Sequence, residues 1–214
     1  MLALPYKRYS YEFNGDFKVA GKSLYLTTPE SHRVAEEACD GDTGISTWDA
    51  AILLAQFLES EPALVAAKNV VELGTGLGVC AISAGLLAAA HVTATDLDYI
   101  LPTTRKNIKL NGLCERVVAK SLDWTKPEEA SINWEGTDVV LASDTVWLEH
   151  LVDPFVDVLV FASQQNPSVK IILSNQMRSE GVWVKFLRLI EPHFTVLPTK
   201  RDGALDIIIL NNRK

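Results

Sequence analysis

Three closely spaced glycines, Gly74, Gly76 and Gly78, are the residues of this sequence best placed for ligand chemistry, because they directly follow an apolar run. Glycine has no Cβ, so its backbone can adopt positive φ and approach a ligand closely. A helix that begins after such a turn directs its free N–H groups toward the same point. The segment therefore predicts a nucleotide-binding turn between a strand and a helix, with an ordinary tight turn as the alternative.

The spacing of the glycines indicates which nucleotide they suit. A dinucleotide-binding turn has the pattern G-x-G-x-x-G, which would require a glycine where the chain has Val79. The pattern present, E-x-G-x-G-x-G beginning at Glu72, resembles the first motif of S-adenosylmethionine-dependent methyltransferases with a seven-stranded sheet. Such a turn offers backbone partners to the methionine carboxylate and amino group and has no diphosphate to hold. A phosphate-binding loop ending at residues 21–23 fails, because its first glycine would fall on Asp16.

Length and composition indicate a single domain, residues 1–214, with a sizeable core. Hydrophobic residues make up 48% of the chain, and the net charge is -7. The acidic balance argues against a nucleic-acid-binding surface and leaves room for a basic target. We expect a soluble, intracellular protein without a membrane partner, because no apolar run approaches the roughly 20 residues that cross a bilayer and no signal-peptide core is present. The three cysteines and four histidines are too scattered to suggest a disulfide framework or a metal site.

The first 30 residues differ in pattern from the rest of the chain. Residues 1–30 alternate polar and apolar positions around turn signals at residues 14–16 (Asn-Gly-Asp) and at Gly21-Lys22. This alternation is typical of short antiparallel strands joined by tight turns. The sequence therefore predicts a small N-terminal β-meander.

Residues 46–214 are predicted to form a Rossmann-like α/β core. Ser46, with Asp49 three residues later, has the pattern of a capping box for a helix that ends near Leu58. Beyond it, short β-branched runs alternate with helical segments, as in a mostly parallel sheet with helices on both faces. The segment Cys80–Ala90 is apolar almost all round and predicts a buried crossover helix. Strands are expected near residues 70–73, 91–95, 116–119, 138–142, 169–173, 193–197 and 205–210.

Asp96 ends the second of these strands, about 20 residues after the glycine turn. At this position a carboxylate can accept hydrogen bonds from both ribose hydroxyls of a nucleoside. Capping of the next helix is the alternative, since aspartate is a common N-cap residue. The distance from the glycine turn favours ribose binding.

Two further strand ends carry candidate site residues. Asp123 and Trp124 follow the third strand, where the carboxylate could accept from an adenine amino group and the ring could stack on the base. A surface turn with a partly buried tryptophan is an equal alternative for these two residues. Strand four ends at Ser143 and is expected beside strand one, so Asp144 faces the crevice where the strand order reverses. We therefore expect the methyl acceptor to enter beside Asp144.

Several segments together resemble one family, and they cover nearly the whole chain. They are Thr47-Trp48-Asp49-Ala50-Ala51, the glycine motif, Thr95-Asp96, Leu122-Asp123-Trp124 and residues 143–149 (Ser-Asp-Thr-Val-Trp-Leu-Glu). The chain looks like the family 16 protein-lysine methyltransferases of the methyltransferase-like 21 branch, which includes enzymes acting on Hsp70-type chaperones, valosin-containing protein and elongation factor 1A. The resemblance implies methyl transfer from S-adenosylmethionine to the ε-amine of a lysine on a chaperone, AAA ATPase or elongation factor.

The resemblance also implies roles for individual residues. The implied contacts to S-adenosylmethionine come from Trp48, Gly74, Thr75, Gly76, Asp96, Trp124 and Ser143. We expect further contacts from Glu72, Leu97 and Asp123, which adjoin these residues or lie at the same strand ends. Asp144 and Trp147 are the expected catalytic residues. The family motif after strand four is D-x-x-Y, and here Trp147 replaces its tyrosine, which keeps an aromatic face and removes a phenolic hydroxyl. A proton-handling role of that hydroxyl is therefore not expected in this chain.

Methyl transfer to lysine requires a neutral amine, which costs roughly 4 kcal/mol to form near neutral pH. Asp144 is a poor base for this step, because a carboxylate has a pKa some 6 units below that of lysine. We expect Asp144 to orient the amine, while the sulfonium charge and partial desolvation lower the amine pKa and water carries the proton away. Trp147 could line the acceptor channel through a cation–π contact, with packing under the next helix as the alternative.

Two other functions are compatible with the sequence. A small-molecule amine N-methyltransferase would use the same pocket, whereas an adenine methyltransferase acting on nucleic acid would carry a proline-rich motif at residues 143–146. A noncatalytic binding module could retain the cofactor fold, and Trp147 leaves that option open. We expect a protein substrate, no nucleic-acid partner, a monomer, and a cytoplasmic or nuclear location.

Overall fold

The computed structural model of the chain describes residues 14–28, 46–203 and 205–213. The strands of its main sheet are β3 (Asn69–Leu73), β4 (His91–Asp96), β5 (Val117–Ser121), β6 (Val139–Ser143), β7 (Lys170–Gln176), β8 (Phe194–Asp202) and β9 (Leu205–Asn212). The α-helices in the described residues are α1 (Asp49–Ser60), α2 (Val79–Leu86), α3 (Leu101–Leu110), α4 (Glu149–Gln165) and α5 (Glu180–Ile190). Every strand expected in the core is present.

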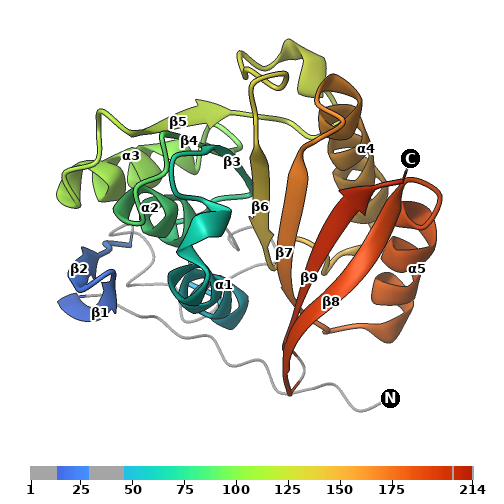
Figure 1. Ribbon diagram of the computed structural model, residues 1–214, viewed down its shortest axis with the longest axis horizontal. Helices are drawn as coiled ribbons and strands as arrows, with labels where there is room; N and C mark the ends of the chain where they lie inside the picture. Colours follow the sequence, from blue (N-terminus) through green and yellow to red (C-terminus); the bar gives the residue numbers. More distant parts are fainter. Residues whose placement is uncertain (1–13, 29–45, 204, 214) are drawn as a thin grey trace.

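The main sheet has the strand order β5-β4-β3-β6-β7-β9-β8. Neighbours from β5 to β7 are parallel, and β9 lies antiparallel between β7 and β8. Helices α1, α2 and α3 cover one face and α4 and α5 cover the other (Figure 1). This arrangement confirms the predicted Rossmann-like fold. The strand order reverses between β3 and β6, where a crevice for a ligand is expected.

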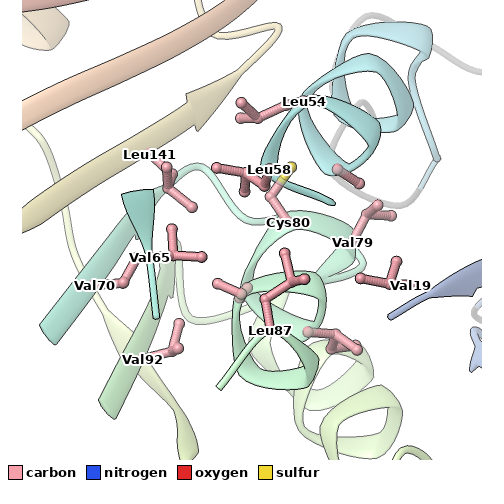
Figure 2. Packing of buried hydrophobic residues seen from close by; sticks show 14 of the residues in the cluster. Val19, Leu54, Leu58, Val65, Val70, Val79, Cys80, Leu87, Val92 and Leu141 are labelled. Atoms are coloured by element: carbon pink, nitrogen blue, oxygen red, sulfur yellow. The ribbon is translucent and has the colours of Figure 1, made fainter. Parts of the chain in front are cut away.

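Alternate residues of the central strands point to opposite faces of the sheet, and both faces are apolar. Along β3, Val70 packs in the cluster of α1 and α2, while Val71 packs in the cluster of α4 and α5. Figure 2 shows Leu58 of α1 and Cys80 of α2 meeting Leu141 of β6 in the first of these clusters. Strands buried on both faces are nearly continuous apolar runs, which explains why they could be recognised in the sequence.

The described part of the predicted meander is a single hairpin, formed by β1 (Asn14–Val19) and β2 (Lys22–Tyr25). The predicted turn at residues 14–16 is wrong, because these residues belong to β1, whose pairing register shifts between Asn14 and Lys18. Gly15 has a φ of 95° there, since glycine suits a β-bulge as well as a turn. The predicted turn near Gly21 is confirmed. The rest of the predicted meander lies outside the described residues.

Asn107 of α3 and Asn111, the C-cap of that helix, attach the end of β2 and the residues after it to the core. Asn111 accepts a hydrogen bond from the backbone N–H of Tyr25 at 2.9 Å and donates to its carbonyl oxygen at 2.7 Å. Asn107 accepts from the backbone N–H of Thr27 at 2.8 Å and donates to the carbonyl oxygens of Thr27 and Leu77 at 3.1 and 3.0 Å. Because Leu77 belongs to the glycine turn, these bonds connect the N-terminal segment, α3 and the turn.

The start of α1 differs from the prediction. Its N-cap is Trp48 rather than Ser46, and no side chain caps the helix. Asp49 lies in the first turn, where its negative charge interacts favourably with the free N–H groups of the helix start. The predicted capping box is therefore wrong, and the helix begins three residues later than Ser46.

None of the described helices combines the length and the apolar character needed to cross a membrane. Within the same residues, no group of three or more histidine, cysteine, aspartate or glutamate side chains could hold a metal ion. Of the described cysteines, Cys80 is a buried free thiol and Cys114 is an exposed one.

Candidate active site

A cavity of about 560 Å³ opens at the carboxyl ends of β3, β4, β5 and β6. This is the place where the strand order reverses, and the volume is typical of a cofactor site. Except for Glu72, all residues predicted for the site line this cavity: Trp48, Gly74, Thr75, Gly76, Asp96, Leu97, Asp123, Trp124, Ser143, Asp144 and Trp147. The fold thus brings residues from distant parts of the chain to one place.

The glycine turn has a backbone that side chains would disturb. Gly74, Gly76 and Gly78 have φ values of 65°, 53° and 94°, in the region that L-residues other than glycine rarely adopt. A Cβ on Gly74 would lie 3.2 Å from a ring carbon of Trp124 and 3.3 Å from the methyl group of Thr145. Glycine is therefore required at this position both by its φ and by the space available.

Hydrogen bonds from β4 and α3 hold the turn in place. The backbone N–H of Thr75 donates to the carbonyl oxygen of Thr95 at 2.9 Å. The N–H of Gly76 donates to the carboxylate of Asp96 at 2.8 Å, and the hydroxyl of Thr104 donates to the carbonyl oxygen of Gly76 at 2.7 Å. These bonds fix the main chain that forms one wall of the cavity.

Glu72 lies beneath the turn and does not line the cavity. It shares a face of β3 with Val70, toward α2, and is 1% exposed. Its Oε2 atom accepts hydrogen bonds from the hydroxyl of Thr75 at 2.5 Å and from the backbone N–H of Ala81 at 2.9 Å. Burial raises the pKa of Glu72 from 4.5 to about 7, although these hydrogen bonds oppose the shift. Glu72 therefore supports the turn from below.

Asp96 combines a structural role with a position in the cavity wall. Its Oδ2 atom accepts from Gly76, and its Oδ1 atom accepts from the backbone N–H of Leu97 at 2.8 Å. Burial raises the pKa of Asp96, and these two bonds oppose the shift. The alternative role as a helix cap does not apply, because the N-cap of α3 is Ile100. Each carboxylate oxygen can accept a further hydrogen bond, which suits ribose hydroxyls.

Asp123 and Trp124 lie side by side in the chain at the end of β5, with different degrees of burial. Asp123 is exposed, and its Oδ1 atom accepts from the backbone N–H and the hydroxyl of Thr125 at 2.9 and 2.8 Å, which lowers its pKa. Trp124 is half-buried, with its ring centroid 5.1 Å from that of Phe155. The ring both packs on the core and lines the cavity, so the two expected alternatives for Trp124 are compatible.

Asp144 is buried, and hydrogen bonds fix both its backbone and its carboxylate. Its backbone has a φ of 55°, which is unusual for a residue other than glycine, and its N–H donates to the carbonyl oxygen of Ser174 at 2.8 Å. Its Oδ1 atom accepts from the backbone N–H of Gln176 at 3.1 Å, and its Oδ2 atom accepts from the guanidinium of Arg178. Burial raises the pKa of Asp144, and the charge of Arg178 opposes that shift most strongly.

Arg178 is a site residue that the sequence analysis did not identify. Its guanidinium carbon lies 4.7 Å from the ring centroid of Trp48, so the side chain contacts both an aromatic face and the carboxylate of Asp144. Arg178 follows β7, which pairs with β6 and ends at the same edge of the sheet. The position of Arg178 just after a strand that ends at this edge is the sequence signal by which it could have been identified.

Trp147 lies next to the start of α4 and is only partly buried. Together with Leu151 and Pro154 of that helix, it forms an apolar part of the cavity wall near Asp144. An apolar wall beside a buried carboxylate suits the aliphatic part of a long amine. The cavity wall therefore combines a glycine turn and carboxylates with apolar surface.

A sequence model of a family described as lysine methyltransferase matches residues 28–193. The chain belongs to this family. Protein N-lysine methyltransferase METTL21A of Xenopus tropicalis is 33% identical to this methyltransferase over 165 residues, which are 76% of this chain and 74% of the relative. EEF1A lysine methyltransferase 3 of Mus musculus is 31% identical over 209 residues, which are 95% of this chain and 84% of the relative.

Solved structures agree with the fold of this methyltransferase. The ribosomal protein L11 methylase from Lactobacillus delbrueckii subsp. bulgaricus matches with a TM-score of 0.56 and 21% identity, over 77% of each chain. TrmN from Thermus thermophilus matches with a TM-score of 0.59 and 22% identity, over 79% of this chain and 50% of the other. The chain is an S-adenosylmethionine-dependent N-methyltransferase, as its family and relatives show.

Proposed function

We propose that this methyltransferase modifies the ε-amine of a lysine on a protein of the chaperone, AAA ATPase or elongation-factor class. The observation that carries the proposal is one cavity containing both the glycine turn with Asp96 and the pair Asp144 and Trp147. The match to EEF1A lysine methyltransferase 3, over most of both chains, supports a substrate of the elongation-factor class.

The wall formed by the glycine turn suits S-adenosylmethionine. A Cβ at Gly74 would crowd Trp124 and Thr145, and without one the backbone of the turn can approach a methionine carboxylate and amino group closely. We assign Asp96 to the ribose hydroxyls, and Asp123 and Trp124 to the adenine. S-adenosylmethionine supplies an electrophilic methyl group on a positively charged sulfur, which an amine lone pair can attack as the neutral thioether leaves.

The other end of the cavity must present the lysine as a neutral amine. Trp147, Leu151 and Pro154 surround the aliphatic chain with apolar surface, and loss of water there lowers the pKa of the ammonium. Asp144 orients the nitrogen through its buried carboxylate, while the proton leaves to water. Its tight fixation by Gln176 and Arg178 suits a group that positions another atom.

Incubation of the purified enzyme with a cell lysate and isotope-labelled S-adenosylmethionine, followed by mass spectrometry, tests this function. We expect labelled lysines in one or a few proteins of the proposed classes. Asp144→Asn, which preserves size and removes the charge, should retain cofactor binding by calorimetry and lose methyl transfer by about 10- to 100-fold. Asp153→Asn, which alters a surface ion pair with Lys185, is the matched control. Labelling of small amines instead of proteins, or full activity of Asp144→Asn, would contradict the proposal.

We also infer that the enzyme acts as a monomer in the cytoplasm, where chaperones and elongation factors are abundant. Light scattering of the purified protein tests the oligomeric state. Fractionation of cells that express the protein tests its location. A stable dimer, or a protein confined to another compartment, would contradict this inference.

A further inference from the structure

A fixed positive charge lies in the wall of the cavity, next to the carboxylate that should receive the amine. The guanidinium of Arg178 pairs with Oδ2 of Asp144, and the two side chains are 13% and 3% exposed. The same guanidinium lies over the ring of Trp48, the N-cap residue of α1. All three residues line the cavity. Because arginine does not lose its proton in proteins, this charge is permanent.

The charge of Arg178 favours the ionised form of Asp144. Burial favours the neutral form of a carboxyl group, and Asp49 of α1 adds a repulsive negative charge. Arg178 opposes both effects and is the cation that acts on Asp144 among the described residues. The ion pair with Arg178 compensates the carboxylate charge of Asp144 within the wall.

Compensation of the Asp144 charge matters because the acceptor lysine must react as the neutral amine. A buried carboxylate without a partner would stabilise a lysine ammonium, and the resulting ion pair would bind well but could not attack a methyl group. A carboxylate already paired with arginine can accept a hydrogen bond from the nitrogen without favouring its protonation to the same degree. A second cation nearby also disfavours the charged form of lysine.

We propose that Arg178 is a positioning residue for methyl transfer: by pairing with Asp144 and stacking on Trp48, it compensates the carboxylate charge so that the target lysine is held as the neutral amine. This inference rests on the proposed function, in which the acceptor is a lysine beside Asp144.

The pH profile of kcat, at saturating cofactor and acceptor protein, tests the proposal. In Arg178→Met the acidic limb should move up by about one pH unit, which lowers kcat at pH 7 by about tenfold, and KM for the acceptor should not rise. Arg178→Lys retains a positive charge and should keep most of the parental profile. Lys185→Met removes a cation that pairs with Asp153 on the surface and should leave the profile unchanged. An unshifted limb in Arg178→Met, or a higher kcat at pH 7, would overturn the proposal.

A second measurement works without any acceptor and separates this proposal from the proposed function. NMR titration of ¹³C-labelled aspartate carboxyl groups follows Asp144 in the parent and in Arg178→Met, with calorimetry of S-adenosylmethionine binding as the check on folding. We expect the pKa of Asp144 to be higher in the variant than in the parent, because the charge of Arg178 no longer opposes the effect of burial. Equal titration of Asp144 in both proteins would refute the role of Arg178. If the parent methylates no protein lysine, the proposed function fails, and the proposal for Arg178 fails with it even when Asp144 titrates as expected.

Discussion

The protonation state of the buried Glu72 side chain affects the stability of the glycine turn. It accepts hydrogen bonds from Thr75 and Ala81, and burial raises its pKa from 4.5 to about 7. Between these pH values the folded protein keeps a proton that the unfolded chain has released. The stability contributed by this proton is fully present below about pH 4.5 and is lost as the pH rises through about 7.

We expect Glu72→Gln to remove this pH dependence, because glutamine retains an oxygen acceptor for Thr75 and Ala81 but does not ionise. From about pH 4 to about pH 8, the free energy of unfolding of the parent should fall relative to that of the variant by about 3 kcal/mol. Urea denaturation of both proteins across this range measures the difference. Glu129→Gln, at an exposed carboxylate, should show no such trend. A difference that stays constant with pH would mean that Glu72 titrates normally.

At the scale of elements, Asn107 of α3 and its C-cap Asn111 hold the N-terminal segment, and Asn107 also connects it to the glycine turn. The bonds of Asn107 to Leu77 are buried, whereas those of Asn111 to Tyr25 are exposed. Water can replace the partners of Asn111 but not those of Asn107. The two residues therefore form a natural pair for comparison.

We expect Asn107→Ala to lower the free energy of unfolding by about 3 kcal/mol, because it leaves the buried carbonyl oxygen of Leu77 and part-buried backbone groups of Thr27 without partners. Asn111→Ala should cost about 1 kcal/mol. Urea denaturation measures both values, and calorimetry should show weaker S-adenosylmethionine binding only for Asn107→Ala. Equal losses of stability in the two variants would contradict the assigned difference in burial.

The elements could be predicted from the sequence more completely than the contacts between them. Central strands such as β3 and β6 are buried on both faces and form continuous β-branched runs. Asp96 and Asp144 followed from the rule that carboxyl ends of parallel strands meet where the strand order reverses. Arg178 and Asn107 did not follow, because their partners Asp144 and Thr27 lie 34 and 80 residues away in the chain.

The position of Glu72 also escaped the sequence analysis, for a different reason. The motif placed it beside the glycines, but the alternation of side chains along β3 turns it toward α2 and away from the cavity. Similarly, the pattern of Ser46 and Asp49 predicted a helix cap, whereas α1 begins after Trp48. The motif around Glu72 was recognised, but its side chain was assigned to the wrong face of β3. The start of α1 was also recognised, but its cap was assigned to the wrong residue.

At the scale of the whole molecule, cofactor binding should stabilise the fold, since the cavity is built from four strand ends and parts of α1 and α4. S-adenosylhomocysteine at about 100 times its Kd should add about 2.7 kcal/mol of stability. For a chain of this size, that corresponds to a rise in Tm of roughly 5–10 °C. Thermal unfolding followed by circular dichroism measures it. NAD should cause no comparable shift because the glycine spacing does not suit a dinucleotide, and an equal shift would contradict that assignment.

The place of β9 in the sheet has a consequence for synthesis of the protein. β9 is the last strand in the chain, yet it lies between β7 and β8 and pairs with both. On the ribosome, β8 therefore emerges before the strand that joins it to the sheet. The glycine turn follows β3 and Asp96 ends β4, so the methyl-donor half of the site is synthesised early. The pairing that supports β7, the strand before Arg178, is completed only when β9 has been made.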